Sequence, residues 1–379
     1  MNQNADLLSS LIRKGVSIPH PQSVFISGEV DPELIDASVS LHPGTRLQGA
    51  SLSIGPESVI GKETPATVVD CQIGKGVSLK GGYVEGSVFL DGSSVGSSAH
   101  VRPGCLLEEE ACAAHAVGLK QTILYPFVTL GSLINFCDVW MTGGTSRKNH
   151  SEVGSSFIHF NFTPHGDKAT ASLLGDPASG LLLNQSPVFL GGQGGIVGPV
   201  HMAHGVVQAA GSICRRDLKD PDHLFQSAVK KERWQPYATG NIRDMNNRVS
   251  HNLTYIGSLI ALRTWYRDFR SVVMPQDVFT RACLEGADQL LKGAVEERCK
   301  QLHKLVGLAE GWDALPGRVE RAVEENVGSS ELRKLAEESL PKFGKGYTAG
   351  MQALDPEQGD VIIKFFERQQ HRFAICAEG

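Results

Sequence analysis

The chain of 379 residues lacks the sequence signals of several common protein classes. It contains no run of eighteen consecutive apolar residues, so no membrane-spanning helix is expected. Its first fifteen residues hold no apolar stretch long enough for a secretory signal peptide. We therefore predict a soluble, cytoplasmic protein that does not associate with membranes.

Paired cysteine motifs and basic runs are also missing. The eight cysteines are scattered without any C-x-x-C pair, which argues against a zinc ribbon and a disulfide scaffold and favours reduced thiols. The net charge is about −5 and no long basic segment occurs, so a nucleic-acid partner is not expected.

Glycine, by contrast, is abundant: the chain has 42, of which 29 lie in the first 212 positions. In this region apolar residues recur every six positions, as at Phe89, Val95, Val101 and Leu107. Six is not a multiple of the helical period of 3.6, and so many glycines would destabilise a helix. The pattern predicts a left-handed parallel β-helix, in which six-residue units form short flat strands and eighteen residues make one coil.

The pattern divides the chain into three parts: an N-terminal capping helix at 1–15, a β-helix domain at 16–217 and an α-helical domain at 218–379. The first helix would cover the open apolar end of the β-helix with Leu7, Leu8, Leu11 and Ile12. A frayed tail is the alternative for this segment. The six-residue repeat weakens between 124 and 187, where we expect loops that leave the coil.

After Pro221 the apolar period becomes helical. One stripe has steps of four and three residues: Tyr255, Leu259, Leu262, Tyr266, Phe269 and Val273. A second helix carries Leu284, Leu291, Val295, Leu302 and Val306 on one side. The aromatic residues of the first stripe are expected to form core rather than a ligand site.

Arg102 and Lys120 are the most informative charged pair. They lie eighteen residues apart, so they should project at the same place on successive coils. Parallel strands stack at about 4.8 Å, and two cations that close repel unless water or an anion lies between them. The spacing therefore indicates an anion site. The alternative is that both side chains are solvated, or are paired with Glu108, Glu109 or Glu110.

Several motifs resemble a known family: V-R-P-G (101–104), V-G-L-K (117–120), S-E-V-G (151–154), N-F-T-P-H-G-D-K (161–168), L-L-G-D (173–176) and F-L-G-G-Q-G-G-I-V-G-P-V (189–200). The hexapeptide repeats resemble the left-handed β-helix acyltransferase superfamily. Within it, residues 95–217 look most like the C-terminal acetyltransferase domain of the bifunctional enzyme that makes UDP-N-acetylglucosamine. The resemblance covers about a third of the chain. It includes neither the uridylyltransferase domain of that enzyme nor the helical region here.

This resemblance implies a homotrimer with active sites between neighbouring solenoids. It also implies acetyl-CoA laid along the groove, with Gly191 and Gly192 as cofactor-binding positions. Arg102 and Lys120 match the family's pair that grips a sugar phosphate, and such charge-assisted contacts are strong. Asn161 and Lys168 match the substrate asparagine and the lysine of the same loop.

The run G-G-T-S-R-K-N-H-S, 143–151, adds further cations beside two glycines. Glycine N–H groups together with Arg147 and Lys148 would cradle a phosphate or pyrophosphate. If these residues converge with Arg102, Lys120 and Lys168, the site would suit a nucleotide sugar better than a monophosphate.

The sequence departs from the family at the general base. Ser132 stands at the position of the family's catalytic histidine, and Asn135 at that of its partner tyrosine. Both are therefore predicted to bind substrate. A serine without an adjacent base does not take a proton from an ammonium group, and general-base catalysis is typically worth ~10²–10⁴-fold. Either another histidine serves as base, or the site binds its ligand without acetylating it. The candidate bases are His150, His159 and His165, which are close in sequence to the matched loop, and His115 near Lys120. Of these, His150 and His165 are the predicted catalytic residues.

The sequence leaves three candidate functions, which we give in order of preference. The first is acetyl-CoA-dependent acetyl transfer to a sugar phosphate or nucleotide sugar in UDP-N-acetylglucosamine metabolism. The second is a non-catalytic, trimeric sugar-nucleotide-binding or assembly protein that has lost the base. Nucleotidyl transfer ranks third, because the domain that performs it is absent. No metal is expected, since His201 and His204 are three residues apart, where the zinc-binding β-helix enzymes use five.

Overall fold

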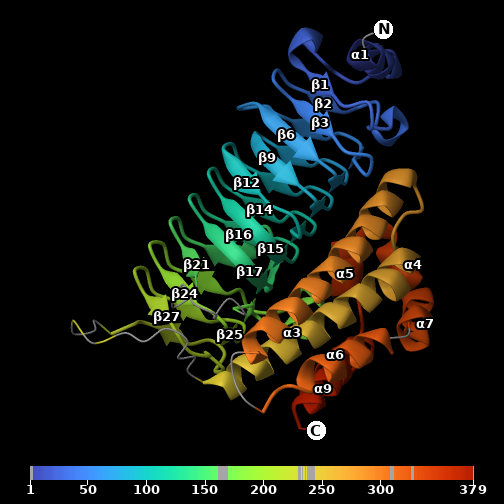
Figure 1. Cartoon of the computed structure of the whole chain (residues 1–379). Helices are drawn as coiled ribbons and strands as arrows, with labels where there is room; N and C mark the ends of the chain where they lie inside the picture. The colour runs from blue at the N-terminus through green and yellow to red at the C-terminus, as the bar shows by residue number, and fades with distance from the viewer. Residues whose placement is uncertain are drawn as a thin grey trace.

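The computed structural model describes residues 3–160, 170–228, 244–307, 311–325 and 328–378, and the single positions 232, 234 and 236. It consists of a parallel β-solenoid followed by a group of α-helices that packs along one side of the solenoid (Figure 1). This arrangement confirms the predicted fold class of a parallel β-helix followed by a helical region.

One face of the solenoid is a ten-stranded parallel sheet. Its strands are β2 (Ser40–Leu41), β5 (Val59–Ile60), β8 (Ser78–Leu79), β11 (Ser94–Val95), β14 (Cys112–Ala113), β16 (Thr129–Leu130), β20 (Glu152–Val153), β23 (Phe189–Leu190), β26 (Val207–Gln208) and β28 (Leu224–Phe225). The pairing of β26 with β28 continues the solenoid beyond residue 217.

The remaining faces belong to a sixteen-stranded sheet. Its strands are β1 (Phe25–Ile26), β3 (Arg46–Gln48), β4 (Ser53–Ile54), β6 (Ala66–Val69), β7 (Gln72–Ile73), β9 (Gly82–Glu85), β10 (Val88–Phe89), β12 (Ala99–Val101), β13 (Leu106–Leu107), β15 (Gly118–Leu124), β17 (Asn135–Met141), β21 (Ile158–Phe160), β22 (Ser172–Leu174), β24 (Gly195–Val197), β25 (His201–Met202) and β27 (Ile213–Cys214).

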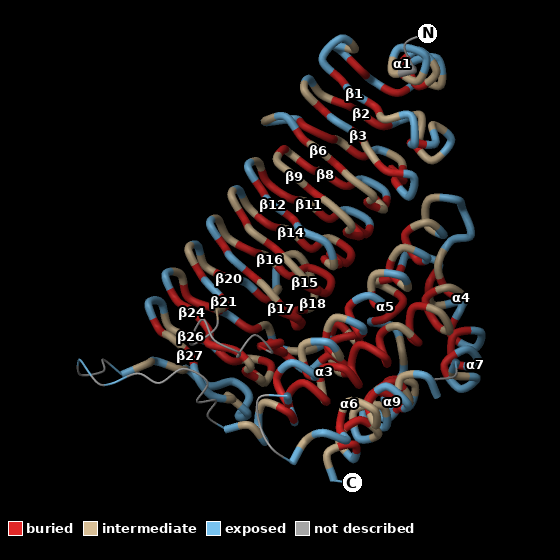
Figure 2. The backbone as a smooth tube through the Cα atoms, viewed as in Figure 1, coloured by how far each residue is buried: buried red, intermediate tan, exposed pale blue. Residues whose placement is uncertain are grey.

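The strand register explains the six-residue period. Coils are eighteen residues apart at three pairings: Val88↔Leu106, Ser94↔Cys112 and His100↔Gly118. Side chains alternate across a strand, so one residue of each short strand points inward. On the ten-stranded face these inward residues form a continuous buried column: Leu41, Ile60, Leu79, Val95, Ala113, Leu130, Val153 and Leu190. Figure 2 shows this buried interior running the length of the solenoid.

The repeat weakens after residue 124 because longer segments leave the coil there. Between β17 and β21 lies an antiparallel hairpin of β18 (Gly144–Ser146) and β19 (Asn149–His150). Between β22 and β23 lies the short helix α2 (Pro177–Gly180). The prediction of loops in this region is confirmed.

Helix α1 (Gln3–Lys14) packs against β1 at the N-terminal end of the solenoid (Figure 1). Leu8 and Leu11 are buried there. Ile12 was expected on the same face and is instead exposed. Each helical residue is rotated by about 100° from the one before it, so Ile12 lies about 100° from Leu11, at the edge of the apolar stripe on the far side of Leu8.

The helical region consists of α3 (Met245–Trp265), a π-helical turn (Tyr266–Arg270), α4 (Ser271–Val273), α5 (Val278–Val306), α6 (Leu315–Glu324), α7 (Ser330–Ser339), α8 (Tyr347–Gln352) and α9 (Pro356–Ala374). Helix α3 packs between α5 and α9. Both predicted apolar stripes are buried, including Trp265, Tyr266 and Phe269. Among the described helices, none combines the length and the apolar character needed to cross a membrane.

The helical region is fixed to the solenoid by buried charges as well as apolar packing. Helix α5 contacts β4, β7 and β10. Arg270 lies 3.0 Å from Glu108 and also pairs with Glu109, and both carboxylates are buried. The hydroxyl of Tyr266 donates a hydrogen bond to Glu108. These two glutamates are therefore engaged with the helices and not with Arg102 or Lys120.

Candidate functional site

Arg102 and Lys120 lie at the same corner of successive coils. Val101 is the register partner of Leu119, and the backbone N–H of Arg102 donates to the carbonyl of Leu119 at 2.9 Å. The predicted stacking of the two cations is confirmed. Among the described residues, neither side chain takes part in an ion pair.

Both side chains line a pocket of about 320 Å³ at this corner. The solenoid contributes Arg102, Lys120, Asn135, Cys137, Asp138, His159, Phe160 and Thr170, and α5 contributes Glu297, Arg298 and Gln301. Asn135 was predicted to bind substrate, and the structure places it with the two cations. The contribution of α5 was not predicted, because the spacing of a solenoid gives no information about what packs beside it.

Asp138 and Arg298 join the solenoid to the helical region inside this pocket. Arg298 Nη2 lies 2.8 Å from Asp138 Oδ1, and both side chains are nearly buried. Burial raises the pKa of Asp138, while Arg298 and Lys120 oppose that rise. Removing one partner of such a pair leaves an uncompensated buried charge, so the ion pair holds α5 against the rim of the pocket.

His159 is a buried residue that lines the pocket, and it is not available as a general base. Its Nε2 lies 2.8 Å from Ser172 Oγ, and the ring is also hydrogen-bonded to the backbone of Cys137. Burial lowers the pKa of His159 to about 4, so the imidazole is neutral at pH 7. Burial also raises the pKa of Cys137 to about 11, which keeps it as an unreactive thiol.

Ser132 has a histidine partner from the preceding coil. Its Oγ lies 2.9 Å from Nδ1 of His115, which is exposed at the neighbouring corner. The coil is seventeen residues long here, since Gly118 pairs with Asn135. His115 and Ser132 are likewise seventeen residues apart. His115 was among the candidate bases, but sequence proximity to the matched loop favoured His150 and His165. Counting one coil back from Ser132 would have singled out His115.

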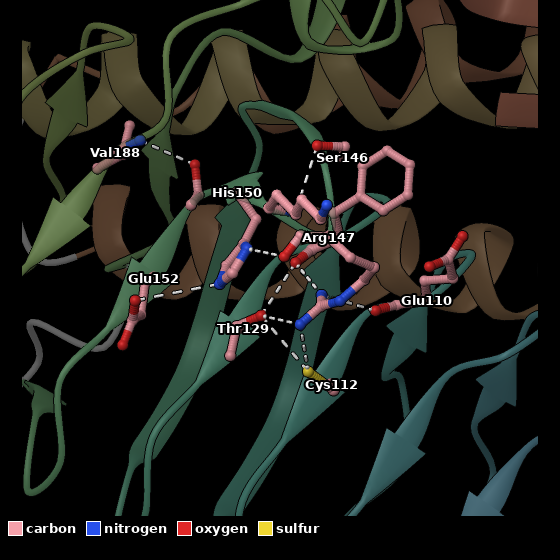
Figure 3. Close-up of polar contacts among 11 residues, drawn as sticks. Glu110, Cys112, Thr129, Ser146, Arg147, His150, Glu152 and Val188 are labelled. Carbon is pink, nitrogen blue, oxygen red and sulfur yellow. Dashed lines mark hydrogen bonds and ion pairs between the residues drawn. The ribbon is translucent and has the colours of Figure 1, made fainter. Parts of the chain in front are cut away.

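The structure does not bring Arg147 to the pocket that Arg102 and Lys120 line. Its guanidinium donates to the carbonyls of Glu110 and Phe127 at 3.0 and 2.6 Å, to Thr129 Oγ1 at 2.9 Å and to Cys112 Sγ at 3.2 Å (Figure 3). These contacts tie the β18–β19 hairpin to the ten-stranded face. Arg147 is thus fully engaged inside the protein and has a structural role.

His150 and Lys148 remain with this hairpin. The Nδ1 of His150 is hydrogen-bonded to the carbonyl of Arg147 at 2.9 Å, and its Nε2 lies 4.0 Å from Glu152 (Figure 3). Lys148 is exposed. The N–H of Gly144 donates to Gln185, so it is not free to cradle a phosphate. The convergence of these residues with Arg102 and Lys120, which the sequence suggested, does not occur.

Gly191 and Gly192 allow close packing of neighbouring coils. A Cβ on Gly191 would lie 2.3 Å from the nitrogen of Ala210, and one on Gly192 would lie 2.9 Å from the carbonyl oxygen of Ser155. The requirement for glycine here has a structural cause that is independent of any cofactor. Asn161, His165 and Lys168 lie outside the described residues.

Within the described ranges, no group of three His, Cys, Asp or Glu side chains is placed to hold a metal ion. His204 is hydrogen-bonded to Thr142 at 2.8 Å, and His201 packs against His251 with ring centroids 4.0 Å apart. These two histidines therefore have separate partners.

Comparison with known proteins finds relatives of the solenoid. The bifunctional protein GlmU of Shouchella clausii is 27% identical over 207 residues, which are 55% of this chain and 40% of the relative. GlmU of Streptococcus equi subsp. zooepidemicus is 29% identical over 201 residues, 52% of this chain and 38% of the relative. Over these residues the chain is similar to the GlmU proteins. It spans about two fifths of their length, and the resemblance inferred from the motifs is confirmed.

Two further comparisons add little to this relationship. No protein-family model matches the chain. Among solved structures, the polysialic acid O-acetyltransferase OatWY is 12% identical, with 59% of this chain and 91% of that chain covered. Its TM-score of 0.18 is too low to support a comparison of the two folds.

Proposed function

We propose that this GlmU relative transfers an acetyl group from acetyl-CoA to the amino group of a phosphorylated amino sugar. The pocket formed by Arg102, Lys120 and Asn135 would bind the sugar through its phosphate. The observation that carries the proposal is the convergence of two cations without ion-pair partners among the described residues. A phosphate between them removes their mutual repulsion and forms charge-assisted hydrogen bonds.

The proposed base is the His115–Ser132 pair. Ser132 is three residues before Asn135, in the turn that leads into β17, where Leu133 has a positive φ of 60°. The amine nitrogen attacks the thioester carbonyl and forms the C–N bond, and the C–S bond breaks to release the CoA thiolate. The proton that leaves the nitrogen passes through the Ser132 hydroxyl to His115 and is then returned to the thiolate. In this scheme the histidine lost at position 132 is replaced by one from the preceding coil.

Acetyl-CoA enters this scheme as the acyl donor. Gly191 and Gly192, which the resemblance suggested for its binding, are packed against neighbouring coils, and Gly191 already donates its N–H to Gln208 at 2.8 Å. We therefore assign no individual donor-binding residue. In the family, active sites lie between neighbouring solenoids, and the same arrangement is proposed here.

A homotrimer of solenoids is part of the proposal. Phe189, Val207 and Leu224 are register partners on consecutive strands of the ten-stranded face, and they are 40%, 38% and 68% exposed. An exposed apolar column of this kind is a typical protein–protein contact. Packing of this column against a second copy of the chain would bury it and would give the oligomer that the resemblance implies.

The second candidate function is sugar-nucleotide binding without catalysis. It is favoured by Ser132 and Asn135, which stand where the family has its histidine and tyrosine. Thiol release from acetyl-CoA in the presence of glucosamine 1-phosphate separates the two functions. Turnover by the wild type that is lost in His115→Ala and kept in His150→Ala supports acetyl transfer. Absence of turnover on amino sugars, together with retained sugar-nucleotide binding, favours the second function.

A further inference from the structure

We infer that Arg298 of α5 makes this pocket a diphosphate site, so that the substrate is a nucleoside diphosphate sugar rather than a sugar monophosphate. The inference rests on the proposed function, in which the pocket binds a sugar phosphate. It concerns a residue from the helical region, which lies outside the segment that resembles the acetyltransferase family.

The first observation is a buried hydrogen-bond donor without a partner. Arg298 is only 3% exposed, and its Nη1 has no hydrogen-bond partner among the described residues. A buried donor without a partner destabilises the protein, because the group has lost its water and gained no other acceptor. Because Arg298 lines the pocket, an acceptor on a bound ligand would satisfy this nitrogen.

The second observation is that the guanidinium is held in place before any ligand arrives. Its other terminal nitrogen, Nη2, lies 2.8 Å from Asp138 Oδ1. Asp138 belongs to β17, the same strand as Asn135. A planar guanidinium that is fixed on one side presents its remaining N–H groups in a defined direction, which suits recognition of a phosphate.

The charges around the pocket are consistent with a ligand that carries more than one negative charge. Three cationic side chains, Arg102, Lys120 and Arg298, face two carboxylates, Asp138 and Glu297. Asp138 is paired with Arg298, and Glu297 accepts a hydrogen bond from Gln301 at 2.6 Å. Glu297 and Gln301 are thereby oriented together and offer polar groups for sugar hydroxyls.

The positions of the cations distinguish two phosphates from one. Arg102 and Lys120 project from adjacent coils about 4.8 Å apart, which allows both to contact a single phosphate. Arg298 comes from α5, a separate element of the pocket wall. A ligand with two linked phosphates would place one beside Arg102 and Lys120 and offer the other as an acceptor for Nη1 of Arg298. The pocket of about 320 Å³ is at the small end of the range for ligand sites. We therefore place the phosphates and sugar inside it and the nucleoside beyond its edge.

Calorimetric titration with UDP-N-acetylglucosamine and with glucosamine 1-phosphate tests the inference. We expect Arg298→Lys to weaken binding of the diphosphate about tenfold or more and to change binding of the monophosphate less than about twofold. Lysine keeps a positive charge beside Asp138 and lacks the second planar nitrogen. Arg298→Gln should weaken diphosphate binding further, and thermal unfolding of each variant identifies any loss of folding. Arg281→Lys, on an exposed part of α5, is the matched control.

The possible results separate this inference from the proposed function. If Arg298→Lys stays folded and binds both ligands as the wild type does, or weakens both equally, Arg298 does not select a diphosphate and the inference is overturned. If the wild type binds neither ligand, the proposed function itself fails. A wild type that prefers glucosamine 1-phosphate also overturns the inference while leaving the sugar-phosphate site intact.

Discussion

The Nδ1 of His115 lies 2.9 Å from Oγ of Ser132, one coil further along the solenoid. This contact places an imidazole beside the serine that occupies the position of the family's catalytic histidine. In a fold built from stacked coils, each corner residue has neighbours one coil before and one coil after it. The imidazole of the site can therefore come from the preceding coil. The pair is the basis of the proposed proton transfer.

Replacement of His115 by Ala should lower kcat for acetyl transfer by about 10²–10⁴-fold, the usual contribution of a general base. KM for the sugar phosphate should change little, because His115 is absent from the pocket around Arg102 and Lys120. Steady-state thiol release measures both constants. His150→Ala is the control and should keep wild-type kinetics. Equal losses in the two variants would contradict the assignment of His115.

Arg147→Ala should destabilise the protein without weakening sugar-nucleotide binding. The substitution leaves the carbonyls of Glu110 and Phe127 without their guanidinium partner. Loss of charged hydrogen bonds of this kind should lower the free energy of unfolding by about 1–3 kcal/mol. Denaturant unfolding and calorimetry measure the two effects, with the exposed Lys148→Ala as control. A large loss of affinity at unchanged stability would show instead that Arg147 contributes to ligand binding.

The buried carboxylates beneath the helical region predict a pH dependence of stability. Burial raises the pKa of Glu109 to about 7, with Arg270 opposing the rise and Glu108 adding to it. The ordinary value for glutamate in an unfolded chain is about 4.3. The folded state therefore binds a proton that the unfolded state has released, and this contribution to stability is present below about pH 4 and lost as the pH rises through about 7.

In Glu109→Gln this pH dependence should shrink, because glutamine has no proton to lose and still accepts a hydrogen bond from Arg270. Thermal unfolding at pH 5 and pH 7.5 should show a smaller difference in Tm for the variant than for the wild type. The exposed Glu57→Gln serves as control. An unchanged difference in Glu109→Gln would show that Glu109 is already ionised throughout this range.

Val207→Glu should disrupt the proposed oligomer. The substitution places a charge in the middle of the exposed column Phe189, Val207 and Leu224. Light scattering should give the mass of three chains for the wild type and a lower mass for the variant. Val278→Glu, an exposed apolar position at the start of α5, should leave the mass unchanged. A monomeric wild type would be evidence against assembly through this face.

Much of the fold could be predicted because each inward residue of the solenoid repeats a local pattern. The six-residue period predicted the strands, and the apolar stripe from Tyr255 to Val273 predicted the first long helix. The coil length of eighteen likewise placed Arg102 above Lys120. These features depend on periodicity, which a single sequence displays directly.

The composition of the pocket could be predicted only in part. Arg298 is 160 residues from Asp138, and no period links the helices to the coils on which they pack. Arg147 looked like a ligand-binding cation because its neighbours in sequence are glycines and polar residues. Its real partners, among them Glu110 and Thr129, belong to earlier coils that the hairpin folds back upon. Contacts of this kind arise from tertiary structure, and the local sequence pattern does not predict them.

Calorimetric titration of UDP-N-acetylglucosamine into wild type and Arg102→Ala tests the central claim, that Arg102 and Lys120 form a phosphate-binding site. We expect the wild type to bind and Arg102→Ala to bind at least about tenfold more weakly, since a charge-assisted contact contributes about 1.5–3 kcal/mol. Arg46→Ala, an exposed arginine on a coil far from the pocket, should bind as the wild type does. Equal affinity of Arg102→Ala and wild type, or a wild type that binds neither UDP-N-acetylglucosamine nor glucosamine 1-phosphate, would contradict the claim.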